Sequence, residues 1–241
     1  MTLPPKPPPA WGSNGLTQFF DKVRQNQYAT FHNHPFSVRI VAIDGLFMRL
    51  LDTPINPQPM MPLTFMLRAH SAWRAGAAAA MSGQVYESNA LLRSALEATS
   101  YGLFIGDDVS KFEAFMARHD TLDAADKVRS TFSARKMAAH LRTLSVPLAD
   151  DFDKLYDMMI DNGAHPNQRG ITFNSAIRDE NGNTFIDTIY LHGSGMTLDL
   201  GLKNVVRVGM TVLHLFRLVY SEKFELLGVS AALDEMRATP I

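Results

Sequence analysis

Residues 86–101 read YESNALLRSALEATSY and repeat their apolar positions with the period of an α-helix. At about 100° per residue, Leu92, Leu96 and Thr99 form one apolar stripe, and small or apolar residues make up most of the opposite side. A helix that is apolar on most sides is usually buried, so this segment predicts the central member of a helical bundle. The narrow face that remains is polar and consists of Tyr86, Asn89, Arg93, Glu97 and Tyr101.

Helical periodicity extends along most of the chain on both sides of this segment. Good helix formers fill residues 63–106, where Gly83 marks a break, and apolar residues recur at helical spacing in 150–160. The clearest pattern runs over residues 202–220, with a continuous apolar stripe and a polar stripe opposite it. Nearer the N-terminus, His32-Asn-His-Pro35 separates two amphipathic stretches, because proline disfavours the helical conformation of the residue before it.

One region departs from the helical pattern. Residues 171–177 (ITFNSAI) and 184–190 (TFIDTIY) are rich in β-branched and aromatic residues, and they flank the turn-forming sequence DENGN at 179–183. This arrangement predicts a β-hairpin at about 171–191. A two-stranded hairpin alone is marginally stable in water, so we expect it to pack on the helices or on another subunit.

The predicted fold is therefore mainly α, a helical bundle with one inserted β-hairpin. Residues 15–241 are expected to form a single helical-bundle domain. Residues 1–14 precede it and carry five prolines within the first nine positions, a composition typical of a disordered tail.

Composition excludes several classes of site. The 241 residues are 46% hydrophobic with a formal net charge of −1, so no overall charge draws the chain to nucleic acid or to anionic lipid. The absence of cysteine excludes disulfides, thiolate metal sites and a cysteine nucleophile. The most apolar run, residues 205–220, contains Arg207, His214 and Arg217 and is too short to span a bilayer. We expect a soluble cytoplasmic protein with no membrane contact.

The two charges on the central helix, Arg93 and Glu97, require partners if they are buried. Buried charges are stable only when they are paired and hydrogen-bonded. Arginine preceding glutamate at i,i+4 is the less favourable order for an exposed pair, which indicates further partners for each. A structural ion pair within one helix is the plainer interpretation, and a functional site is the alternative.

A resemblance adds two residues to this pair. Leu92-Arg-Ser-Ala-Leu-Glu-Ala98, followed later by Tyr156-Asp-Met-Met-Ile-Asp-Asn-Gly-Ala-His-Pro166, resembles an uncharacterised bacterial family of helical proteins. That family has an L-R-x-x-x-E-A helix and a later helix with a central tyrosine and a terminal His-Pro. It is similar in layout to HEPN domains, which include metal-independent ribonucleases of toxin and phage-defence systems. The resemblance covers residues 63–166 and implies that Arg93, Glu97, Tyr156 and His165 converge on one site.

An alternative pair lies on the predicted last helix. HEPN ribonucleases are marked by an arginine and a histidine separated by four to six residues, and Arg135/His140 and Arg207/His214 have this spacing. Two such pairs are no more than chance produces in a chain of this composition. Seven positions along a helix return to the same face, so Arg207 and His214 are the better-aligned pair, although a solvated polar stripe explains them equally well.

His165 is open to two interpretations. It follows Asn162-Gly163, a pair that predicts the end of the preceding helix, and an imidazolium there is favoured by the helix dipole. It would then serve only as a cap. Alternatively, an imidazole at this place would act as a general acid or base near neutral pH or bind a phosphate.

Two functional hypotheses follow. The first is an interaction or regulatory module, present as a homodimer, in which the Arg93/Glu97/Tyr156/His165 cluster is structural or binds a small anionic ligand. The second is a HEPN-like metal-independent ribonuclease, in which histidine and arginine act on RNA phosphate. The expected partners are a second copy, RNA or a partner protein. We expect neither cofactor nor metal, because the chain has no phosphate-binding glycine loop and no Glu-x-x-His motif.

Overall fold

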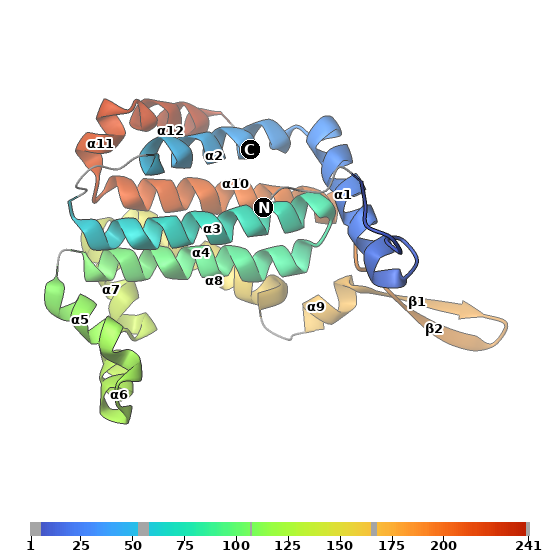
Figure 1. Cartoon of the computed structure of the whole chain (residues 1–241), viewed down its shortest axis with the longest axis horizontal. Helices are drawn as coiled ribbons and strands as arrows, with labels where there is room; N and C mark the ends of the chain where they lie inside the picture. The colour runs from blue at the N-terminus through green and yellow to red at the C-terminus, as the bar shows by residue number, and fades with distance from the viewer. Residues whose placement is uncertain (1–5, 53–57, 107, 165–167, 240–241) are drawn as a thin grey trace.

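The computed structural model describes residues 6–52, 58–106, 108–164 and 168–239, and within these ranges the chain is mainly helical with one two-stranded antiparallel sheet (Figure 1). The predicted fold class, a helical bundle with one inserted β-hairpin, is confirmed. In chain order the elements are α1 (Gly15–Asn33), α2 (Phe36–Leu51), α3 (Met60–Ser82), α4 (Val85–Ile105), α5 (Val109–Met116), η1 (Ala117–His119), α6 (Leu122–Thr131), α7 (Ala134–Leu144), α8 (Val146–Met159), η2 (Ile160–Ala164), α9 (Gln168–Phe173), β1 (Ser175–Glu180), β2 (Asn183–Thr188), α10 (Met196–Arg217), α11 (Ser221–Leu226) and α12 (Val229–Ala238).

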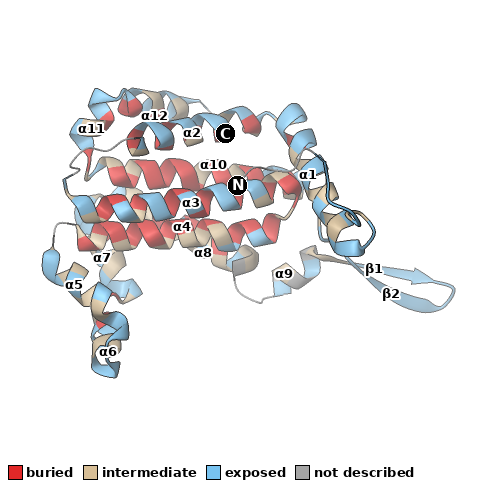
Figure 2. Cartoon of the chain, in the orientation of Figure 1, coloured by how far each residue is buried: buried red, intermediate tan, exposed pale blue. Residues whose placement is uncertain are grey.

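The centre of the bundle consists of α3, α4 and α10, which lie side by side and hold most of the buried residues (Figure 2). Helices α2, α8 and α12 pack around these three and contribute to the same core. Close approach of α3 and α10 depends on Gly209, where an added Cβ would lie 2.7 Å from Nε1 of Trp73. That indole nitrogen donates a hydrogen bond to the Val205 carbonyl at 2.9 Å, so Trp73 both fills the core and joins the two helices.

A smaller apolar cluster lies at one end of the bundle. Ile105 at the end of α4 packs there with Val128 of α6 and Phe132, and all three are buried. The short helices α5 and α6 extend from this end, and apart from Val128 their residues are exposed or only partly buried (Figure 2). None of the helices in the described ranges is long and apolar enough to cross a membrane.

Two helix boundaries differ from the prediction. The helix expected from residue 150 begins at Val146, with Pro147 inside its first turn. Proline is tolerated there because the amide hydrogens of the first turn have no partner within the helix. The first predicted strand is shortened, because residues 168–173 form α9 and β1 begins only at Ser175. Tertiary context therefore outweighs the β propensity of this segment.

The hairpin extends away from the helices (Figure 1). β1 and β2 pair in antiparallel register around Asn181 and Gly182, whose φ angles of 53° and 77° suit a tight two-residue turn. Every residue of β2 is exposed, and so is every residue of β1 except Ser175. The hairpin therefore does not pack on the helices of its own chain, which was one of the two arrangements expected for it.

The proline-rich N-terminal segment contacts α1 over its described part. Nε1 of Trp11 donates to Oδ1 of Asp21 at 2.9 Å, and the Trp11 ring lies 6.1 Å from that of Phe20 between centroids. The amide of Gly12 also donates to the Thr17 hydroxyl at 2.9 Å. Residues 1–5 of the predicted disordered tail lie outside the described residues.

Candidate functional site

Three of the four predicted site residues meet where α8 crosses α4. Arg93 and Glu97 lie one turn apart on α4, and Nε of Arg93 donates to Oε1 of Glu97 at 2.9 Å. The hydroxyl of Tyr156, from α8, donates to the same carboxylate oxygen at 2.8 Å and accepts from Nε of Arg93 at 3.3 Å. The Arg93 guanidinium carbon also lies 5.3 Å from the centroid of the Tyr156 ring. We call these three residues the Arg93–Glu97–Tyr156 cluster.

The end of α8 is fixed against the polar face of α4 by the turn that follows it. Nδ2 of Asn89 donates to the Asn162 carbonyl at 2.6 Å. Gly163 has a φ of 134°, and an added Cβ would lie 2.8 Å from the carbonyl oxygen of Tyr86. Only glycine fits this conformation and this approach without strain. His165, the fourth predicted member of the site, lies outside the described residues.

Burial and hydrogen bonding set the charge state of two members of the cluster. Burial raises the pKa of Tyr156, and its hydrogen bond to Glu97 raises it further. Burial acts to lower the pKa of Arg93, but the hydrogen bond to Tyr156 and the charge of Glu97 outweigh it, so this pKa rises. Arg93 therefore stays cationic and Tyr156 stays a neutral phenol across the physiological range. Neither residue exchanges a proton near neutral pH.

A pocket of about 320 Å³ opens beside the cluster and includes two of its members, Glu97 and Tyr156. Aromatic rings form much of its wall: Phe152 stacks on Tyr156 with centroids 5.8 Å apart, and Phe132 stacks on Tyr101 at 5.3 Å. These rings come from α4, α8 and the end of α6, so the pocket exists only in the assembled bundle.

The polar groups of this pocket are acidic or hydroxylic. Its charged lining residues are Glu97 and Asp153, and it has no lysine or arginine among its described lining residues. Asp153 already pairs with Arg142, whose Nη2 lies 2.6 Å from Oδ2. The Ser100 hydroxyl donates to the Glu97 carbonyl at 2.9 Å. Within the described ranges every bond to the Glu97 carboxylate uses Oε1, which leaves Oε2 as an acceptor.

The alternative pair, Arg207 and His214, lies on α10, and no hydrogen bond or ion pair joins the two side chains within the described part of the chain. Nε2 of His214 is buried and has no hydrogen-bond partner among the described residues. Burial has the largest effect on the pKa of His214 and lowers it, and the charge of Arg237 on α12 lowers this pKa further. The His214 side chain is therefore partly buried, with its Nε2 shielded from solvent and the charges of α12 acting on it.

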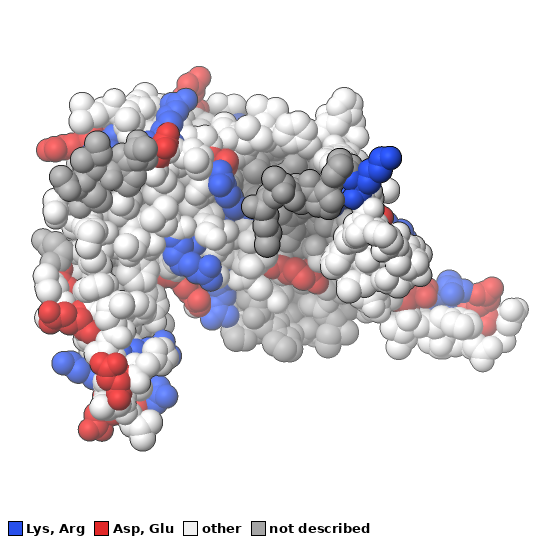
Figure 3. Space-filling view, viewed as in Figure 1, with Lys and Arg blue, Asp and Glu red and all other residues white. Residues whose placement is uncertain are grey.

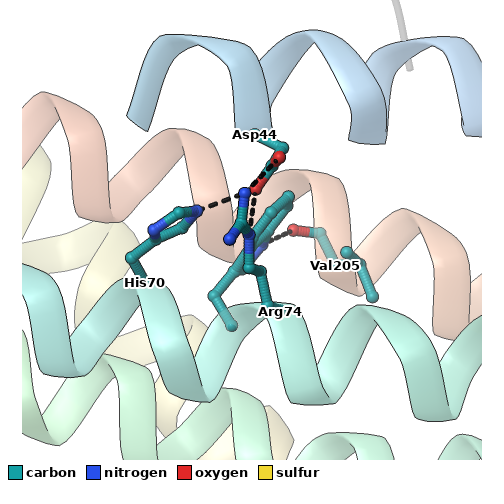
Figure 4. A network of polar contacts seen from close by, with 5 residues as sticks. Asp44, His70, Arg74 and Val205 are labelled. Atoms are coloured by element: carbon teal, nitrogen blue, oxygen red, sulfur yellow. Dashed lines mark hydrogen bonds and ion pairs between the residues drawn. The ribbon is translucent and has the colours of Figure 1, made fainter. Parts of the chain in front are cut away.

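A second polar cluster, which was not predicted from the sequence, consists of Asp44, His70 and Arg74 and joins α2 to α3 (Figure 4). Nε2 of His70 lies 2.8 Å from Oδ1 of Asp44, and Arg74 binds both oxygens of this carboxylate, at 2.6 and 2.8 Å. His70 also stacks on Phe47, with ring centroids 4.6 Å apart. The spacing of His70 and Arg74 by one helical turn, and the single acidic residue in 36–51, were the available signals.

This second cluster is best explained as structural. The hydrogen bond from Arg74 lowers the pKa of Asp44 despite the opposing effect of burial. Burial is the largest influence on the pKa of His70 and lowers it, although the bond to Asp44 acts in the opposite direction. The bidentate arginine and the neutral imidazole thus satisfy one partly buried carboxylate between two helices.

The described ranges hold no group of three or more histidine, aspartate and glutamate side chains placed to bind a metal ion. Comparisons of the chain with protein-family models, with curated proteins and with solved structures found no match. The resemblance to HEPN-like proteins therefore stays a prediction, and the geometry of the cluster and its pocket is the basis for a functional proposal.

Proposed function

We propose that this chain is a regulatory or interaction module that binds a small ligand in the pocket beside the Arg93–Glu97–Tyr156 cluster. One observation carries the proposal: Glu97 and Tyr156 belong both to the hydrogen-bonded cluster and to the pocket wall. Their hydrogen bonds fix the positions of polar atoms that a ligand would meet. An apolar pocket with a few positioned polar groups is the usual form of a small-molecule site.

The lining favours a ligand with an amine and an aromatic or aliphatic body. The Ser100 and Tyr156 hydroxyls already donate hydrogen bonds within the protein, so few side-chain donors remain to hold an anion. Oε2 of Glu97 is an acceptor suited to an ammonium group, and aromatic rings attract cations over their faces. The proposed ligand is therefore a small organic cation, opposite in charge to the anion expected from the sequence.

The protonation states of the cluster support binding over acid–base catalysis. A general acid or base works best when its pKa lies near the operating pH. The pKa values of Arg93 and Tyr156 are both raised above ordinary values that are already far from neutrality. Arg93 and Tyr156 therefore keep fixed charge states and can orient the Glu97 carboxylate toward a ligand.

The ribonuclease alternative has less support from the described residues. RNA binding depends on lysine and arginine side chains gathered on one surface. On the face shown in Figure 3, lysine and arginine lie beside aspartate and glutamate, and the charges do not separate by sign. Arg207 and His214 are not bonded to each other in the described structure.

Titration calorimetry with two matched compounds tests the proposal. Tyramine presents an ammonium on a phenol ring, and 4-hydroxyphenylacetate presents a carboxylate on the same ring. We expect tyramine to bind and the acid not to bind. Glu97→Gln should weaken tyramine by about tenfold or more, since a charge-assisted hydrogen bond is lost. Glu222→Gln, the same change at an exposed position on α11, should leave binding unchanged.

Several outcomes would overturn the proposal. The first is that tyramine does not bind, or that Glu97→Gln and Glu222→Gln weaken its binding equally. The second is preferential binding of 4-hydroxyphenylacetate, which would favour the anionic ligand expected from the sequence. The third is metal-independent cleavage of total RNA by the wild-type chain but not by His165→Ala, which would favour the ribonuclease.

A further inference from the structure

The two faces of the hairpin differ in whether their side chains find partners within the hairpin itself. On one face, Arg178 lies over the ring of Phe185 at 4.8 Å, approaches Asp187 at 3.3 Å and pairs with Glu180. The charged side chains of that face therefore pair with one another. Ile177 and Ile186, directly paired in the register, belong to the opposite face. We call the latter the isoleucine face.

The isoleucine face is apolar at its centre and exposed. Ile177 and Ile186 are 74% and 73% exposed, and uncharged hydroxyl side chains flank them toward the bundle. Asp179 is the single charged residue of this face, and its carboxylate accepts a hydrogen bond from the Thr184 hydroxyl at 2.7 Å. A two-stranded hairpin is marginally stable without an apolar face to bury, so this face requires a partner.

An apolar groove of about 810 Å³ lies between α1 and the base of the hairpin. Leu16 and Phe19 of α1 and Tyr190, just after β2, form its wall, and the Phe19 and Tyr190 rings meet edge to face at 6.3 Å. Leu16 and Tyr190 are 63% and 67% exposed. The groove contains one charged lining residue among those described, Lys22, which is exposed.

We propose that two copies of this chain exchange hairpins, so that the isoleucine face of each lies in the α1 groove of the other. The inference is independent of the ligand pocket. The groove and the isoleucine face belong to the same chain, so two copies can bury both surfaces in one interface. Since the groove lies at the base of the hairpin, a twofold arrangement closes with two copies and forms the contact twice.

Charge and length both support a second copy as the occupant. The single cation of the groove, Lys22, and the single anion of the isoleucine face, Asp179, have opposite signs. Neither forms an ion pair within the described part of one copy. The groove follows α1 from Gly15 to Asn26, about 18 Å at 1.5 Å per residue, and a six-residue strand is about 20 Å long. The arm and its groove therefore match in length.

Sedimentation of the full chain over a concentration series tests the exchange. We expect a dimer that dissociates on dilution. The double variant Ile177→Glu/Ile186→Lys should be monomeric with an unchanged circular dichroism spectrum, because both side chains are already exposed and opposite charges directly across the strands are compatible with pairing. Val38→Glu alters an apolar side chain on α2 that is 73% exposed and should remain dimeric. A monomeric wild type, or a dimer that persists in the double isoleucine variant, would overturn the proposal.

Charge reversal identifies the groove. Lys22→Glu and Asp179→Lys should each raise the dimer Kd by about tenfold or more, because like charges then face one another across the interface. The double variant Lys22→Glu/Asp179→Lys should recover most of the wild-type affinity. Failure of the double variant to recover any affinity would overturn the assignment of Asp179 to the groove.

The cysteine-free sequence allows a direct test of exchange between copies. Single variants Leu16→Cys and Ile186→Cys are mixed and oxidised, so that a heterodimeric disulfide requires the hairpin of one copy in the groove of the other. We expect this disulfide to form rapidly. A mixture of Val38→Cys and Ile186→Cys should form its own heterodimeric disulfide much more slowly. Equal rates in the two mixtures would overturn the proposal.

Discussion

The hydroxyl of Tyr156 donates to Oε1 of Glu97 across 2.8 Å, so a side chain from α8 completes an ion pair formed within α4. The two residues are 59 positions apart in sequence. Arg93 and Glu97 keep side-chain exposures of 21% and 40%, so solvent screens their attraction. The contact of Tyr156 with both partners therefore contributes specificity of position more than it contributes stability.

Removing this hydroxyl should have a modest effect on stability. Tyr156→Phe keeps the ring against Phe152 and deletes the hydroxyl that donates to Glu97 and accepts from Arg93, so we expect the free energy of unfolding to fall by about 1 kcal/mol. Urea denaturation measures the change. Tyr28→Phe on α1, where the side chain is 68% exposed, is the matched control and should change little. Equal effects of the two substitutions would contradict a stabilising role for the bond.

The turn after α8 should not tolerate a side chain at residue 163. In Gly163→Ala the new Cβ would meet the Tyr86 carbonyl oxygen at 2.8 Å, and φ of 134° is strained for alanine. We expect a loss of about 1–3 kcal/mol in the free energy of unfolding. Gly193→Ala has open space around its Cβ and should be nearly neutral. Similar melting temperatures for the two variants would argue against the close approach of α4 and η2.

The turn after α8 has one feature that the sequence predicts and one that it does not. Asn162-Gly163 is a local signal for the end of a helix, and the structure has a break in helical geometry at these two residues. The carbonyl of Tyr86 against Gly163 is a tertiary contact between segments more than seventy residues apart, which no local pattern contains. The same limit applies to the pocket, whose aromatic walls come from three helices.

His214 shows how an unpredicted element changes the environment of a residue. Its alignment with Arg207 on one face of a helix follows from spacing alone and is correct as helical geometry. Helix α12 was not predicted from the sequence, and its Asp234 and Arg237 act on the His214 ring. A position expected to lie in a solvated polar stripe is therefore partly buried in the folded chain.

This burial gives His214 a predictable effect on pH-dependent stability. Its pKa in the folded state is lowered from 6.5, so between the two values the unfolded chain binds more protons, and stability falls as the pH drops below about 6.5. Replacing the His214 imidazole should remove its contribution to the fall in stability at acidic pH. His214→Leu should therefore show a flatter melting temperature from neutral to mildly acidic pH than the wild type.

The control for this prediction is His119→Leu, at an exposed position in η1. It should retain the wild-type slope, because an exposed histidine is solvated in the folded chain much as it is in the unfolded chain. Identical slopes for His214→Leu and the wild type would contradict the shielding of an unpartnered imidazole nitrogen from solvent.

The same chemical change, glycine to alanine, should have opposite signs at two helical positions. In Gly209→Ala the added methyl would lie 2.7 Å from Nε1 of Trp73 and 2.8 Å from Cγ2 of Ile43. Overpacking of this kind costs about 1–3 kcal/mol, so we expect a lower melting temperature. Gly45 is exposed within α2, and an added methyl there would meet nothing within 4 Å. Gly45→Ala should therefore stabilise the chain by about 0.5–1 kcal/mol through helix propensity. Thermal unfolding of both variants tests whether α3 and α10 approach as closely as Trp73 requires, since two stabilising substitutions would contradict that packing.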